Sequence, residues 1–260
     1  MFLAVLITSS AALLTLGTVF GNSGIGSSPG GSKTIRRPEF AQSQDPAAPK
    51  ANLRGSGQGT ERREENKKPA DATQYSYEFT QPQFYVRHII IEHNAAGEGK
   101  ITFERLGETT SISEPIELSI GALGRILGMW AQLGFLDSNE NYQSTKQFPH
   151  LGTMRFHMEN GERKRTAEFN WTNNKEAAAL NKEYHGVADQ AMFVFDLSVA
   201  RENQPLNTPK LMESLESLLT RGGLSDPYQL APLLRDLTTD ERVPLITRNH
   251  AARLLKRIEK

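Results

Sequence analysis

Residues 153–171 read TMRFHMENGERKRTAEFNW, and this stretch decides the fold because it predicts two antiparallel strands joined by a tight turn. Asn160-Gly161 is a residue pair typical of a two-residue type I′ turn. Apolar and polar residues alternate on both sides of the turn, with the two-residue period of a half-buried strand. We therefore expect a β-hairpin in the middle of the chain, with one face buried.

A two-residue loop at Asn160-Gly161 would also fix the register of this hairpin. The expected polar pairs are Glu159 with Glu162, His157 with Lys164, Arg155 with Thr166, and Thr153 with Glu168. The other face collects Met154, Phe156, Met158, Ala167, Phe169 and Trp171, with Arg163 and Arg165 near the turn. We expect helices to bury the apolar face, while the polar face meets water or a partner.

A second hairpin is predicted upstream, from strands at residues 84–93 and 100–106 with a turn between them. In the first strand, Phe84, Val86, His88 and Ile90 fall on one face and Tyr85, Arg87, Ile89 and Ile91 on the other. Because both faces carry apolar side chains, this strand is expected in the centre of a sheet. In the second strand, Ile101 and Phe103 are expected to face the core.

Two helical patterns follow the two hairpins. Ser119 can cap a helix that runs to about residue 136. Its expected apolar stripe is Ile120, Leu123, Leu127, Trp130 and Leu133 or Gly134. This helix contains Gly121, Gly124 and Gly128, which we expect to allow close packing on the sheet; a face that pairs with another helix is the alternative.

The second helical pattern opens at Asn173 and Glu176, which are spaced like a capping box. Its expected stripe is Leu180, Tyr184, Val187, Ala191 and Val194. Gly186 weakens the pattern, and residues 192–197 could instead form a buried strand. The order hairpin, helix, hairpin, helix predicts an α+β fold, a two-layer sandwich over residues 75–204.

Residues 205–260 are expected to form a small C-terminal helical segment, with helices at 211–221, 228–237 and 244–259. Within it, residues 229–258 resemble a single HEAT repeat. The matching positions are Leu230, Pro232, Leu233, Leu234, Leu237, Asp240, Arg248, Ala251, Ala252, Leu255 and Ile258. Because such arrays need several units to bury their faces, a single unit should lean on the rest of the chain or on a partner.

The N-terminal region has a different character. Residues 2–20 are free of charge and apolar, and Val19 and Gly21 fit a cleavage site before Asn22, so residues 1–21 are expected to be a signal peptide. The run lacks a preceding Lys or Arg, and its length also suits an uncleaved membrane anchor. Residues 22–74 have the composition of a disordered linker. These features predict an extracytoplasmic protein, either secreted, periplasmic or anchored through residues 1–21.

Composition excludes several classes of function. Thirty basic residues balance thirty acidic ones, which argues against a nucleic-acid binder. The chain has no Cys, so it has neither a thiol nucleophile nor a thiolate metal site. We find no cofactor or catalytic motif, and the pair His185 and Asp189, one helical turn apart, lacks a third metal ligand.

We therefore expect a noncatalytic binding or adaptor module with a protein partner. The candidate binding residues are Arg155, His157 and Lys164 on the polar sheet face, and Arg253 and Arg257 on the last helix. The alternative is an exported hydrolase whose active site is assembled from residues distant in the sequence. An enzyme should show a concave site of polar groups with shifted pKa values, whereas an adaptor should show a flat or grooved surface.

Overall fold

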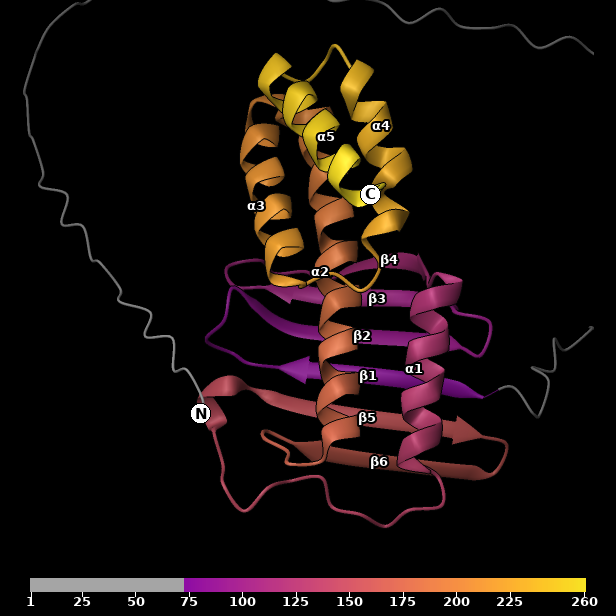
Figure 1. Cartoon of the computed structure of the whole chain (residues 1–260). Helices are drawn as coiled ribbons and strands as arrows, with labels where there is room; N and C mark the ends of the chain where they lie inside the picture. The colour runs from indigo at the N-terminus through magenta and orange to yellow at the C-terminus, as the bar shows by residue number, and fades with distance from the viewer. Residues whose placement is uncertain (1–72) are drawn as a thin grey trace, which may run out of the picture. The chain divides into compact units, whose positions relative to one another are not determined.

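The computed structural model describes residues 73–260, which form an α+β fold, as the sequence predicts (Figure 1). Helices α1 (Ile120–Leu133) and α2 (Lys175–Asn203) lie on one side of an antiparallel sheet. Beyond the sheet, α2 continues into a bundle with α3 (Thr208–Arg221), α4 (Ala231–Thr239) and α5 (Leu245–Ile258). The predicted signal or anchor segment and nearly all of the linker lie outside the described residues.

The sheet contains two strands that the sequence patterns did not reveal. Its strands are β1 (Gln74–Thr80), β2 (Val86–Asn94), β3 (Glu98–Arg105), β4 (Ile112–Glu117), β5 (Thr153–Asn160) and β6 (Arg163–Phe169). Their order is β4-β3-β2-β1-β5-β6. The additional strands are β1, which joins the two predicted hairpins by pairing with β2 and β5, and β4, which forms one edge. β2 lies inside the sheet, as expected.

The register of the β5–β6 hairpin differs from our expectation. Asn160 pairs with Arg163, so the loop is Gly161-Glu162, and Arg155 lies opposite Glu168. Gly161 takes the left-handed conformation, with φ of 59°, while the Asn160 side chain stays in the strand and donates to Thr73 Oγ1 at 2.7 Å. The pairing is shifted by two residues, and an even shift leaves every strand residue on its predicted face. The predicted polar and apolar faces are therefore correct. Trp171 is the exception, because it lies beyond β6 and is 42% exposed.

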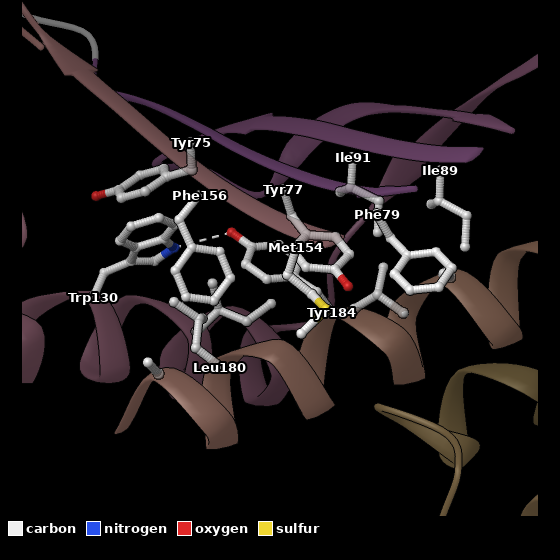
Figure 2. Packing of buried hydrophobic residues seen from close by; sticks show 14 of the residues in the cluster. Tyr75, Tyr77, Phe79, Ile89, Ile91, Trp130, Met154, Phe156, Leu180 and Tyr184 are labelled. Carbon is white, nitrogen blue, oxygen red and sulfur yellow. Dashed lines mark hydrogen bonds between the residues drawn. The ribbon is translucent and has the colours of Figure 1, made fainter. Parts of the chain in front are cut away.

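The main core lies between the sheet and helices α1 and α2 (Figure 2). Tyr77 of β1 is fully buried, and its ring stacks on that of Tyr184 of α2 with centroids 5.0 Å apart. Trp130 of α1 packs edge-on against Phe156 of β5. Ile101 and Phe103 are fully buried, as predicted. Aromatic side chains from both layers therefore hold the sandwich together.

The orientation of α1 corrects our expectation. Ser119 caps the helix as predicted, accepting from the Ala122 N–H at 3.1 Å. The buried stripe is Ala122, Ile126, Trp130 and Leu133, whereas Ile120 is 93% exposed. Trp130 and Leu133 belong to both stripes, and the difference is that Ala122 and Ile126 face the core while Leu123 and Leu127 are only partly buried at its edge. The three glycines consequently lie on the exposed side, so the expectation that they pack on the sheet is wrong.

Helix α2 is longer than predicted. Asn174, one residue after the expected cap, accepts from the Ala177 N–H at 2.9 Å. The helix continues to Asn203, so the alternative strand at 192–197 is wrong. Its second half carries Phe193 and Leu197 into a second core, whose other members come from α3, α4, α5 and the segments between them. Val194, expected on the buried stripe, is 39% exposed.

The predicted C-terminal helices form within a few residues of their expected bounds. The second core buries Met212 and Leu215 of α3, Leu234 and Leu237 of α4, and Ala251 and Leu254 of α5. The apolar stripe of the hairpin at 229–258 therefore packs on α2 and α3 of the same chain. Arg201 of α2 and Arg242 both donate to Asp240 at the end of α4, at 2.7 and 2.9 Å.

At Gly186, α2 packs closely against the backbone of Leu224 and Ser225, the segment that leads into α4. A Cβ at Gly186 would lie 2.8 Å from the Ser225 nitrogen, whereas one at Gly124 of α1 would meet nothing within 4 Å. We expect Gly186→Ala to lower the free energy of unfolding by about 1–3 kcal/mol. Gly124→Ala should raise it by up to about 1 kcal/mol, because only helix propensity changes. Urea unfolding of both variants measures this, and equal effects would contradict the close approach.

Candidate functional site

The most extensive candidate surface is the face of the sheet that points away from α1 and α2, which we call the open face. Neither of the two helices beside the sheet lies on this side (Figure 1). Its polar side chains come from alternate positions of successive strands: Thr102 and Glu104 of β3, His88 of β2, Ser76 and Glu78 of β1, Arg155 and His157 of β5, and Lys164, Thr166 and Glu168 of β6. This arrangement follows from the two-residue period of each strand.

Ion pairs connect these strands across the open face. Arg155 Nη1 donates to Glu78 Oε2 at 2.7 Å, and Arg155 Nη2 donates to Glu168 at 2.9 Å. The other oxygen of Glu78 lies 2.9 Å from His88 Nε2. His88 Nδ1 in turn lies 3.6 Å from Glu104. We call Glu104, His88, Glu78, Arg155 and Glu168 the charge ladder, which crosses five strands.

The charge ladder orients its side chains more than it stabilises the fold. The hydrogen bond to Glu168, followed by the charge of Glu78, raises the pKa of Arg155, so the guanidinium stays charged. Arg155 is about half exposed, with a side-chain exposure of 47%. Exposed ion pairs contribute only about 0–1 kcal/mol each. The ladder therefore presents the Arg155 guanidinium between two carboxylates, with a histidine ring beyond Glu78, in a fixed order on the open face.

The structure brings together three of the five predicted binding residues. Arg155, His157 and Lys164 all lie on the open face, on β5 and β6. His157 Nδ1 is 2.8 Å from Thr166 Oγ1, and Lys164 lies opposite Glu159.

The other two predicted binding residues, Arg253 and Arg257, lie on α5 in the helical bundle and do not join this group. Both are exposed, and Arg257 donates to Thr220 Oγ1 at 3.1 Å.

The part of the site supplied by β1 was not predicted from the sequence. Glu78 joins both halves of the charge ladder, yet the strand that carries it was not predicted, because it follows directly on the linker. The segment QYSYEFT at Gln74–Thr80 carries the signal that would have found it, since Tyr75, Tyr77 and Phe79 alternate with polar residues. Glu78 and Arg155 then follow as cross-strand neighbours.

Three of the histidines, His88, His93 and His185, lie in different environments. His88 lies on the open face and His93 in the core, as the alternation predicted. His185 Nε2 lies 3.0 Å from the Tyr77 hydroxyl, while Asp189 accepts from Arg221, so these two do not act as a pair. Within residues 73–260, no cluster of three His, Asp or Glu side chains could hold a metal ion.

A chain of buried hydrogen bonds runs through the main core. The Trp130 indole donates to the Tyr184 hydroxyl at 3.0 Å (Figure 2), which lies 2.8 Å from His93 Nε2. His93 Nδ1 lies 2.8 Å from the Asn94 carbonyl, and only a nitrogen that carries hydrogen can bond to a carbonyl. Nε2 of the neutral ring therefore accepts from Tyr184. Burial lowers the pKa of His93 and raises that of Tyr184, so the side chains in this series of hydrogen bonds stay uncharged.

A concave site lies beside the edge strand β4, between this strand and α2. This β4 groove has a volume of about 290 Å³. Its apolar lining is Pro115, Ile116, Leu118, Ala122, Val187, Ala191, Val194, Phe195 and Leu230, and its polar lining is Glu114, Glu117, Gln190, Ser198, Ser225 and Gln229. None of the groups whose pKa is clearly shifted lines it.

Comparison with known proteins adds no family to this description. No protein-family model matches the chain, and no curated protein is significantly similar to it. No helix in the described part of the chain is both long and apolar enough to cross a membrane. The function must therefore be argued from the surfaces themselves.

The buried histidines predict how stability depends on pH. Burial lowers the pKa of His93 and His185 below the value of 6.5 that each has in the unfolded chain. Between the folded-state pKa and the unfolded-state pKa of each histidine, the unfolded chain therefore binds more protons than the folded one. The free energy of unfolding should be constant above about pH 6.5 and fall below it, by up to about 1.4 kcal/mol per pH unit for each histidine. Urea unfolding between about pH 5.5 and 7.5 measures this slope.

Two variants identify the groups responsible. His185→Gln should reduce the slope by about half, because one of the two titrating groups is removed. Gly124→Ala, which removes no titratable group, should leave the slope unchanged. A slope that survives in His185→Gln at its full value would contradict the assignment to that histidine.

Proposed function

We propose that this protein is a noncatalytic binding module that acts as an adaptor for a protein partner, and that the open face is its binding surface. The observation that supports this proposal is the charge ladder: five ionisable side chains from five strands are fixed by their neighbours on a face that neither α1 nor α2 covers. Preorganised charges of both signs favour a partner with the complementary pattern.

The dimensions of the open face suit a folded partner. Strands in a sheet lie about 4.8 Å apart, so the face is about 24 Å wide across its six strands. Threonines and serines lie beside the ladder, and the aliphatic side chain of Ile90 lies near its centre, on β2. A mixture of this kind is typical of a surface that associates with a partner and remains soluble alone.

The geometry gives less support to the alternative, an exported hydrolase. Hydrolysis requires polar groups that converge in a concave site, with pKa values suited to proton transfer. The β4 groove is concave, but most of its lining is apolar. A second hollow, of about 220 Å³ on the open face, is polar, but the pKa of its Arg155 is raised away from the range useful for proton transfer. The shifted histidine and tyrosine groups lie in the core instead. We therefore favour binding over catalysis.

The cellular setting is part of the same proposal. We propose an extracytoplasmic location, with residues 1–21 acting as a signal peptide or as an uncleaved anchor and the following linker separating the folded part from the membrane. Under this proposal the partner is a protein of the cell envelope or its surroundings. We also propose that the HEAT-like hairpin at 229–258 is a structural unit, because its apolar stripe packs within the chain.

The decisive experiment compares two surface variants of the immobilised full chain with an envelope extract of the native host. The open-face variant is His157→Glu with Lys164→Glu, and its matched control on α5 is Arg253→Glu with Arg257→Glu. We expect a protein retained by the wild type to bind the open-face variant at least about tenfold more weakly and the α5 variant unchanged. Binding should also weaken as salt is raised.

Each other outcome has a definite reading. If only the α5 variant loses the partner, the binding surface is the C-terminal helix and the open-face assignment is wrong. If both variants retain it, neither predicted surface is the interface. If folded wild-type protein retains nothing, the adaptor proposal fails and hydrolytic activity should be screened. Circular dichroism and melting temperatures establish that each variant is folded.

A further inference from the structure

The β4 groove has features of a site for a small ligand, separate from the open face. Its floor is one side of α2, where Val187, Ala191 and Val194 recur at helical spacing. Ile116 and Leu118 form one wall, and Leu230 another. The groove is concave and mainly apolar, and its volume of about 290 Å³ is at the lower limit for pockets that bind small molecules.

Most polar groups in the lining already have partners within the protein. Gln190 Oε1 accepts from the Asp226 N–H, and Gln190 Nε2 donates to Gln229 Oε1. Gln229 Nε2 donates to the Glu117 carbonyl at 3.1 Å. The two lining serines donate as well, Ser198 to the Phe195 carbonyl and Ser225 to Glu183. These bonds fix the walls of the groove before any ligand enters.

Glu114 is different from the other polar residues of the lining. It pairs across the sheet with Ile101, which is fully buried on the helix side, so its carboxylate is directed toward the apolar groove. Among residues 73–260, no cation or hydrogen-bond donor contacts it, and the groove lining contains no Lys, Arg or His. A partly buried carboxylate without a counterion favours a ligand that supplies the positive charge.

The backbone of β4 limits the shape of that ligand. The Leu118 N–H donates to the Gly97 carbonyl, so Ser113, Pro115 and Glu117 direct their backbone groups away from β3. Pro115 has no N–H, and the Glu117 carbonyl already accepts from Gln229. An incoming peptide strand would therefore lack a regular set of partners, which argues against strand addition at this edge.

We infer that the β4 groove binds a compact hydrophobic amine, whose apolar body lies on α2 and whose ammonium group pairs with Glu114. The inference does not depend on the proposed function, because it concerns a different surface. The amine contributes both interactions that the groove offers, apolar contact and charge. A neutral or anionic molecule of the same shape makes only the first of these interactions.

Three probes of the same shape test the inference on the full chain: phenylbutylamine, phenylbutanol and phenylbutyrate, which are cationic, neutral and anionic at neutral pH. Binding is followed by amide chemical shifts in two-dimensional NMR. We expect the amine to bind with a Kd of about 1 mM or tighter, and the alcohol and the acid at least about tenfold more weakly. The shifted amides should include residues 187–198 of α2.

Two variants and one control make the test specific. In Glu114→Gln the affinity for the amine should fall to that of the alcohol, whereas Glu108→Gln, an exposed glutamate in the β3–β4 loop, should bind the amine as the wild type does. Val194→Trp, which fills the groove from an exposed position, should weaken all three probes. The inference is overturned if the amine and the alcohol bind equally to the wild type, if the shifts map elsewhere, or if no probe binds.

Discussion

The continuity of α2 is the constraint on which the rest of the structure depends, because this one helix contributes side chains to both hydrophobic cores. Leu180 and Tyr184 pack beneath the sheet, whereas Phe193 and Leu197 pack among α3, α4 and α5. A helix of 29 residues spans about 44 Å at 1.5 Å per residue, more than the sheet can cover. The helical bundle buries the half that would otherwise be exposed, and the two parts form one folded unit.

This shared helix also determines which surfaces remain free. Both helices that cover the sheet lie on the same side, so the polar residues of all six strands form one continuous open face. On the covered side, the large aromatic rings fill the space between the layers and satisfy their polar atoms through Tyr184 and His93. The two histidines whose pKa burial lowers, His93 and His185, lie on this covered side. The charge ladder lies instead on the open face.

The sequence predicted those features that depend on local chemistry. Alternation assigned the strand faces, Ser119 marked the start of α1, and the glycine and proline positions bounded the C-terminal helices. The errors concern properties that only tertiary packing determines. The hairpin loop lies one residue later than the Asn-Gly pair predicts, with the Asn160 side chain bonded to Thr73, and α1 turns Ala122 and Ile126 rather than Leu123 and Leu127 into the core. The candidate site was half predicted, since Arg155 was found but its partner Glu78 lies on β1, a strand that was not predicted.

The two edges of the sheet are protected in different ways, and this difference accounts for the groove. Beside β6, the loop at 134–148 is held by Arg165, which donates to the Phe135 and Glu140 carbonyls and lies over the Phe135 ring. β4 has no such cover, and it relies on Pro115 and on the inward carboxylate of Glu114 to discourage pairing with another strand. A charge that protects an edge in this way needs no partner in the same chain. The same carboxylate therefore remains available to a ligand that is too compact to pair as a strand.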